Sequence, residues 1–191
     1  GEISSWGLSL SGNKPSDDST DEELQAGKVS RDKFWDILSK NIKIISRCKR
    51  SEKECKKYDR SSLDGTSFGS FTPIVILADG IYIVGTTVLS PSCTIQATNN
   101  TNVCGEIFVD LNGPKPPNKT GVDVFLFYYT NSSVFPMGSA EDLRVTFKDH
   151  CNVSKKHSLN GYGCSAWVIY NENMDYLHCN DLSWEHKIKC Q

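Results

Sequence analysis

The most informative stretch of the chain reads Val109-Asp110-Leu111-Asn112-Gly113-Pro114-Lys115-Pro116-Pro117-Asn118-Lys119-Thr120-Gly121-Val122-Asp123-Val124-Phe125. It joins two apolar runs, residues 106–110 and 122–129, which predict two β-strands. The three prolines of the stretch cannot sit in a central strand, because proline has no N–H to donate to a neighbouring strand. The connection is therefore predicted to be an irregular, structured loop.

Further elements are predicted on both sides of this loop. Residues 73–78 and 81–85 are apolar runs separated by Asp79-Gly80, which predicts a β-hairpin. Ser30 and Asp32 suit the start of a helix over residues 31–47, in which apolar side chains recur every three or four positions. Residues 143–147 alternate and predict a strand, whereas residues 166–169 fit either a strand or a short helix.

Length and charge restrict the class of protein. The 191 residues contain 21 Lys and Arg against 23 Asp and Glu, so no strong field recruits nucleic acid or anionic lipid. No tract rich in glycine, serine or proline divides the chain. We therefore predict one domain over residues 1–191, with a poorly structured segment at 1–29 and a core at 30–191.

The chain has eight cysteines, an even number, and all of them follow residue 47. This pattern predicts disulfides formed in an oxidising compartment. Chain order suggests four local pairs, although other connectivities remain open. The pairs are Cys48 with Cys55, Cys93 with Cys104, Cys151 with Cys164, and Cys179 with Cys190.

The loop between the two predicted strands offers oxygen ligands. Asp110, Asn112, Asn118 and Asp123 could contribute to a calcium site, which needs roughly six to eight oxygens. The spacing is not that of an EF-hand, and the same residue types also favour turns through local backbone hydrogen bonds. Calcium is thus a hypothesis with turn formation as its alternative, and no other cofactor is predicted.

Catalytic patterns are missing from the sequence. Gly161-Tyr162-Gly163-Cys164-Ser165 is not a hydrolase nucleophile elbow, and the histidines and cysteines lack zinc-ligand spacing. Cys164 is expected to be a disulfide partner, and His150 points away from its neighbour Cys151 if the local chain is regular. We therefore predict that the protein is not an enzyme and has no catalytic residues.

An ordered set of features resembles the head domain of bacterial type IV pilin-like proteins, including type II secretion pseudopilins. In chain order, these features are the Phe34-Trp35 helix with its basic, cysteine-bearing end, the Leu77–Gly80 hairpin, Asp110–Lys115, Pro117-Asn118, Gly121, Asp123-Val124-Phe125, and the segment from Cys164 to Leu177. The resemblance implies an α+β fold, a pilin-like head with an N-terminal amphipathic helix packed on an antiparallel β-sheet and with disulfide-stapled loops.

The resemblance also implies a function and a location. The chain is expected to be a major or minor structural subunit of a type IV pilus (fimbrium) or a type II secretion filament, with other pilin or pseudopilin subunits as partners. It would act at the cell surface or in the periplasm, anchored in the inner membrane before assembly by an apolar helix upstream of Gly1. Membrane contact would occur only through that helix, since the chain has no apolar run of about 18 residues.

An alternative remains from the residues themselves. A secreted, disulfide-rich domain could bind a protein or glycan through Trp6, Trp184 or the loops at 131–163. Four Asn-x-Ser/Thr sequons would suit glycosylation of such a domain, although a chain rich in these residues also produces them by chance. They begin at Asn99, Asn118, Asn131 and Asn152.

Overall fold

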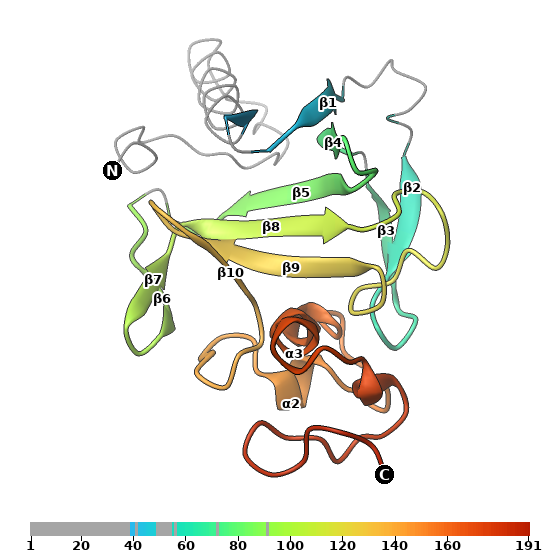
Figure 1. Cartoon of the computed structure of the whole chain (residues 1–191), viewed down its shortest axis with the longest axis vertical. Helices are drawn as coiled ribbons and strands as arrows, with labels where there is room; N and C mark the ends of the chain where they lie inside the picture. The colour runs from blue at the N-terminus through green and yellow to red at the C-terminus, as the bar shows by residue number, and fades with distance from the viewer. Residues whose placement is uncertain (1–38, 41, 49–54, 56, 72, 91) are drawn as a thin grey trace, which may run out of the picture.

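The computed structural model of the chain describes all residues except 1–38, 41, 49–54, 56, 72 and 91. Strands make up 34% and helices 13% of this described part. Its centre is an antiparallel sheet of six strands in the order β1-β4-β5-β8-β9-β10, with two small hairpins beside it (Figure 1).

The strands of the six-stranded sheet are β1 (Ile44–Arg47), β4 (Val75–Leu77), β5 (Tyr82–Val88), β8 (Gly105–Asp110), β9 (Val124–Tyr129) and β10 (Val134–Pro136). The two-stranded hairpins are β2 (Tyr58–Ser61) with β3 (Ser67–Phe71), and β6 (Ile95–Thr98) with β7 (Thr101–Val103). The helical segments are α2 (Phe147–His150), η3 (Tyr162–Cys164), α3 (Ser165–Asn171) and η4 (Asp175–Leu177).

The predicted hairpin around Asp79-Gly80 is confirmed. β4 and β5 pair antiparallel, with Val75 opposite Ile83. Gly80 has a φ of +85°, a conformation that glycine adopts without the penalty of a side chain. The turn is closed by Leu77 N–H, which donates to the carbonyl of Ile81 at 2.8 Å.

The two strands predicted around the proline-rich loop are also confirmed, and the structure pairs them with each other. β8 and β9 are in register over six positions, from Gly105 opposite Tyr129 to Asp110 opposite Val124. The loop between them is irregular, and its far end lies along β2. Thr120 N–H donates to the carbonyl of Ser61 at 2.9 Å, so the loop ties the β2–β3 hairpin to the large sheet.

The predicted helix over residues 31–47, and with it the α+β pilin-like head, is wrong. Residues 44–47 form β1, an antiparallel strand in which Ile44 lies opposite Leu77 and Arg47 opposite Val75. Hydrogen bonds flank this pairing, since Ala78 N–H donates to Lys43 O at 2.9 Å. Pairing with a distant strand therefore overrides the helical spacing, and the described residues form a mostly β structure. Residues 1–38 and 41 lie outside the described residues, so the predicted 1–29 segment does too.

Two predictions in the C-terminal half have different outcomes. Residues 143–147 are not a strand: their backbone bends around Asp142, whose carboxylate accepts from Arg144 N at 2.9 Å and Val145 N at 2.8 Å. Phe147 then begins α2, with Thr146 as its N-cap. Residues 166–169, which left strand and helix open, belong to α3.

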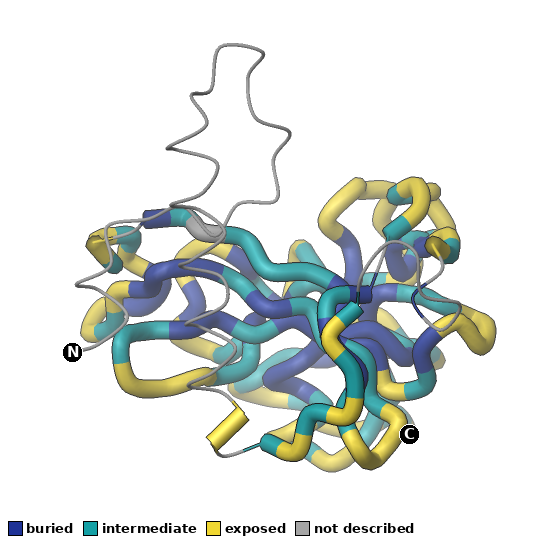
Figure 2. The backbone as a smooth tube through the Cα atoms, turned by 90° about the horizontal axis from the view of Figure 1, so that it is seen from above, coloured by how far each residue is buried: buried dark blue, intermediate teal, exposed yellow. Residues whose placement is uncertain are grey.

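The helical segments form a layer against β9 and β10, and the C-terminal segment wraps its outside (Figure 1). The core of this layer is aromatic: Phe147 and Trp167 stack with ring centroids 4.1 Å apart, and Tyr176 packs edge-on against Phe147. Buried residues run through the centre of the molecule, whereas the exposed ones gather at loop tips (Figure 2). No helix among the described residues has the length and hydrophobicity that crossing a bilayer requires.

Candidate functional site

Asp110 lies at the end of β8 and is fully buried. Its Oδ2 accepts from the Tyr58 hydroxyl at 2.7 Å, and its Oδ1 accepts from the N–H groups of Asn112 at 3.1 Å and Gly113 at 2.8 Å. A carboxylate with three donors is satisfied without a metal ion. Asp110 therefore closes the turn that starts the loop and anchors β2 to it.

Asp123 closes the other end of the loop. Its two carboxylate oxygens accept from Asn118 N at 2.9 Å and Lys119 N at 2.6 Å. The Asn118 amide nitrogen, in the orientation that satisfies its hydrogen bonds, donates to the carbonyls of Gly113 and Lys115. Asn118 thus presents donors to the inside of the loop, where a cation would need oxygens.

Three of the four predicted calcium ligands, Asp110, Asn118 and Asp123, therefore shape the loop through their side chains. Among the side-chain oxygens of these four residues, the Oδ1 atom of Asn112 alone is buried without a hydrogen-bond partner. No group of three or more His, Cys, Asp or Glu side chains that could hold a metal ion occurs in the part of the chain that the structure describes. The turn-forming alternative accounts for the positions of Asp110, Asn118 and Asp123.

A buried cation lies beside the start of the loop. Arg60 is 4% exposed, and its guanidinium lies 3.7 Å from the centroid of Phe71. Burial lowers the pKa of Arg60, and the charges of Tyr162, Tyr58 and Asp110 act in the opposite direction. Burial also raises the pKa of Asp110, against the effect of its hydrogen bonds. The aromatic face and these neighbours stabilise a charge whose Nε and Nη1 atoms have no hydrogen-bond partner.

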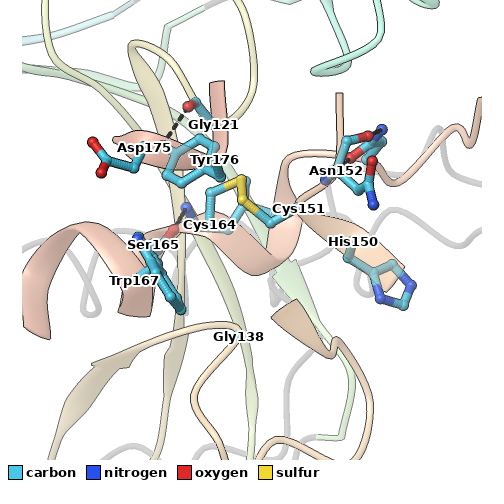
Figure 3. Close-up of a disulfide and its surroundings, with 12 residues drawn as sticks. Gly121, Gly138, His150, Cys151, Asn152, Cys164, Ser165, Trp167, Asp175 and Tyr176 are labelled. Atoms are coloured by element: carbon cyan, nitrogen blue, oxygen red, sulfur yellow. Dashed lines mark hydrogen bonds between the residues drawn. A yellow bond between two sulfur atoms is a disulfide. The ribbon is translucent and has the colours of Figure 1, made fainter. Parts of the chain in front are cut away.

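The eight cysteines form four disulfides, and the partners are those that chain order suggested. The pairs are Cys48–Cys55, Cys93–Cys104, Cys151–Cys164 and Cys179–Cys190. Cys151–Cys164 is buried in the helical layer, between the end of α2 and the start of α3 (Figure 3). It is unavailable as a thiolate nucleophile while the bond is intact.

The loop meets this disulfide at Gly121. A Cβ on Gly121 would lie 2.8 Å from Cys164 Sγ, and its φ is +80°, so only glycine fits without strain. The Tyr176 hydroxyl donates to the Gly121 carbonyl at 2.7 Å (Figure 3). Three segments that are far apart in the chain are thereby fixed at one point.

The other polar groups of this region also serve the backbone. Ser165 is buried, and its Oγ accepts from Leu126 N at 2.8 Å. His150 points away from the disulfide (Figure 3), with its Nδ1 3.3 Å from Thr146 O. No described serine or cysteine of this cluster faces a histidine in the way that a nucleophile and its base require.

The tryptophans divide between core and surface. Trp167 is fully buried, and its indole N–H donates to Asn173 Oδ1 at 3.0 Å. Trp184 is half-buried: its ring lies 4.9 Å from Trp167, and its N–H donates to Gly138 O at 3.2 Å. Trp6 and Trp35 lie outside the described residues.

Trp184 also lines an open groove of about 580 Å³ between α2 and the C-terminal segment. Its walls come from residues 139–149 and 180–186, and they include the carboxylates of Asp142, Asp149, Asp181 and Glu185. Lys155 pairs with Asp149, and Lys187 with Asp181, each at 2.6 Å. Sequence reasoning marked Trp184 and the 131–163 loops but not the groove itself, because its walls come together only in the folded chain.

The chain matches no family model, no curated protein and no solved structure.

Proposed function

We propose that the chain is a non-catalytic structural subunit of a type IV pilus-like or type II secretion filament, acting on the extracellular or periplasmic side of the inner membrane. One observation carries the proposal: two parts of the ordered set that are separated in the chain pack against each other. Gly121 is one part of that set, Cys164 and Tyr176 belong to another, and Gly121 contacts both of these residues. A set that depends on mutual contacts gives a physical reason for its members to occur together.

The use of the polar side chains supports a structural role. The buried carboxylates of Asp110 and Asp142, and the buried Ser165 hydroxyl, all accept hydrogen bonds from backbone N–H groups. Four disulfides add constraints that suit a domain exposed to an oxidising, mechanically stressed environment. A building block needs this stability, whereas an enzyme needs polar groups free to react.

Exposed apolar side chains offer a surface for subunit contacts. Ile169 and Tyr170 of α3 are 48% and 61% exposed. The exposed Ile188 belongs to the C-terminal segment, which Asn173 holds near α3 by donating to Ile188 O at 3.1 Å. Apolar groups of this kind mark contact sites more often than catalytic ones.

The test is N-terminal sequencing with intact mass on the protein produced from its full natural gene in its own host. An N-methylated phenylalanine followed by roughly 20 apolar residues is the expected result, because such a segment anchors a pilin-like subunit and then packs in the filament. A mature protein that starts near Gly1 after a conventional signal peptide would refute the proposal.

The groove beside Trp184 favours a second candidate, a secreted domain that binds a protein or glycan ligand. It joins Trp184 to residues 139–149 of the 131–163 loops, which are two of the three regions that the sequence alone marks for recognition. Screening immobilised glycans and peptides with the wild type and with Glu185→Lys, an exposed position on the rim, tests this candidate. Selective binding that Glu185→Lys abolishes supports it, and equal binding by both proteins counts against it.

A further inference from the structure

The loop between Cys151 and Cys164 is held at its centre by a buried amide. Asn160 is fully buried, and its Nδ2 donates to the carbonyls of Asn152 and Lys155, both at 2.6 Å. Its Oδ1 accepts from Asn152 N at 3.1 Å. These bonds involve no titrating group, so they persist over the ordinary pH range.

The outer end of the same loop is held differently. The His157 N–H donates to Asp64 Oδ2 at 2.8 Å, which joins the loop to the turn of the β2–β3 hairpin. Leu159 N–H donates to His157 Nδ1 at 3.1 Å. A ring nitrogen accepts a hydrogen bond only while it is unprotonated, so this second bond needs a neutral imidazole.

A second histidine faces the first. The rings of His150 and His157 are 5.3 Å apart and nearly perpendicular. Burial lowers the pKa of His150, and the charge of His157 lowers it further, whereas the Thr146 carbonyl, Asp149 and Asp142 act in the opposite direction. Two imidazolium groups at this separation repel each other.

The remaining charges around the pair are mixed. Asp149 is already engaged by Lys155 at 2.6 Å, and Lys148 and Lys156 are chain neighbours of the two histidines. Asp64 accepts from Ser62, Thr66 and His157, and these bonds outweigh burial and lower its pKa. Asp64 therefore remains charged.

We propose that residues 152–160 contain a pH-sensitive latch: the His157 ring holds the Leu159 N–H while both imidazoles are neutral and releases it when they are protonated, whereas the bond from the His157 N–H to Asp64 persists. Asn160 and the Cys151–Cys164 disulfide keep the rest of the loop in place. Asn152 and Lys155, whose carbonyls Asn160 holds, line a small cavity of about 120 Å³ over Phe147 and Tyr176, so this cavity should keep its walls when the latch opens. The latch is a property of the loop and does not depend on the proposed filament role.

The test follows backbone amide exchange by NMR from about pH 7.5 to about pH 5, the range in which histidine titrates. Each pH unit below the histidine midpoint should raise the opening constant of the Leu159 amide about tenfold, after correction for intrinsic exchange. The Leu63 amide, which donates to Asn160 O at 2.9 Å, should keep its protection. His157→Asn should remove the pH dependence, because an amide oxygen accepts the same bond without titrating.

Two more variants separate a latch from general softening. His150→Gln removes the repulsion, so the Leu159 transition should move to higher pH, whereas His186→Gln, at an exposed position in the C-terminal segment, should leave it unchanged. Equal Leu159 protection at both ends of the pH range would overturn the proposal. So would parallel loss of Leu63 protection, or a transition that persists in His157→Asn.

Discussion

Two loops of this molecule are held by similar geometry and different chemistry. In the loop between Asp110 and Asp123, the loop's own carboxylates accept from backbone N–H groups. In residues 152–160, the Asn160 amide and the His157 imidazole do so, and Asp64 of the β2–β3 turn accepts from the His157 N–H. The loops meet at glycines, since a Cβ on Gly121 would lie 3.1 Å from the Gly161 Cα. The comparison teaches that a loop bond whose acceptor is protonated near neutral pH is lost there, whereas a bond whose acceptor does not titrate in that range is kept.

Removing a carboxylate should produce the largest loss of stability. Asp110→Ala leaves the Tyr58 hydroxyl and two backbone donors without their acceptor, and each buried unpaired group costs roughly 1–3 kcal/mol. The expected loss in the free energy of unfolding is about 3 kcal/mol, measured by denaturant unfolding. Asp59→Ala, on the exposed side of β2, should cost less than about 0.5 kcal/mol. Equal losses in both variants would show that Asp110 does not hold the loop.

The contact between the two loops can be tested with a matched pair of glycines. Gly121→Ala introduces a Cβ against Cys164 Sγ at a φ of +80°, whereas Gly65→Ala, at a φ of +88°, has no atom within 4 Å of its Cβ. Strain in the backbone alone should cost Gly65→Ala about 1 kcal/mol, and crowding should bring the cost for Gly121→Ala to about 2 kcal/mol. Thermal and denaturant unfolding measure both. Matching losses would mean that the close approach at Gly121 is absent in solution.

The histidine-held loop should give a smaller, pH-dependent effect. The pKa of His150 is lowered from 6.5 in the folded protein, chiefly by burial, so the unfolded chain binds more protons below that value. Stability is therefore complete above pH 6.5 and falls as the pH decreases from 6.5 through the folded-state pKa. His150→Gln should flatten the slope of unfolding free energy against pH in this window. An unchanged slope would remove His150 from the account.

The sequence predicted the local parts of the fold better than the long-range ones. The hairpin at Asp79-Gly80 depends on neighbouring residues, and chain order was enough to suggest all four disulfide pairs. The spacing of apolar residues from Phe34 to Ile45 predicted a helix up to residue 47, whereas residues 44–47 form the edge strand β1. That strand depends on pairing with β4 about thirty residues away, which local spacing does not reveal. Ile45, a member of that apolar stripe, is 61% exposed.

The candidate site shows the same limit. The sequence offered Asp110, Asn118 and Asp123 as calcium ligands or as turn-forming residues, because these residue types suit both roles. The directions of their hydrogen bonds favour turn formation. Asp142 was not singled out, although it is buried and holds the bends before α2. Asp142 binds the backbone of residues 144 and 145, which belong to a segment whose alternating apolar and polar residues predicted a strand. That prediction gave no reason to expect Asp142 to hold a bend there.

The central claim is that the carboxylates of the Asp110–Asp123 loop fold the domain and do not hold a ligand. The most direct measurement is denaturant unfolding of the wild type and of Asp123→Ala, each with and without calcium. The account predicts that Asp123→Ala loses about 2 kcal/mol, because two backbone donors lose their acceptor, and that calcium changes neither protein. A wild type stabilised by about 2.7 kcal/mol at a calcium concentration 100 times the Kd, with the gain absent from Asp123→Ala, would contradict it.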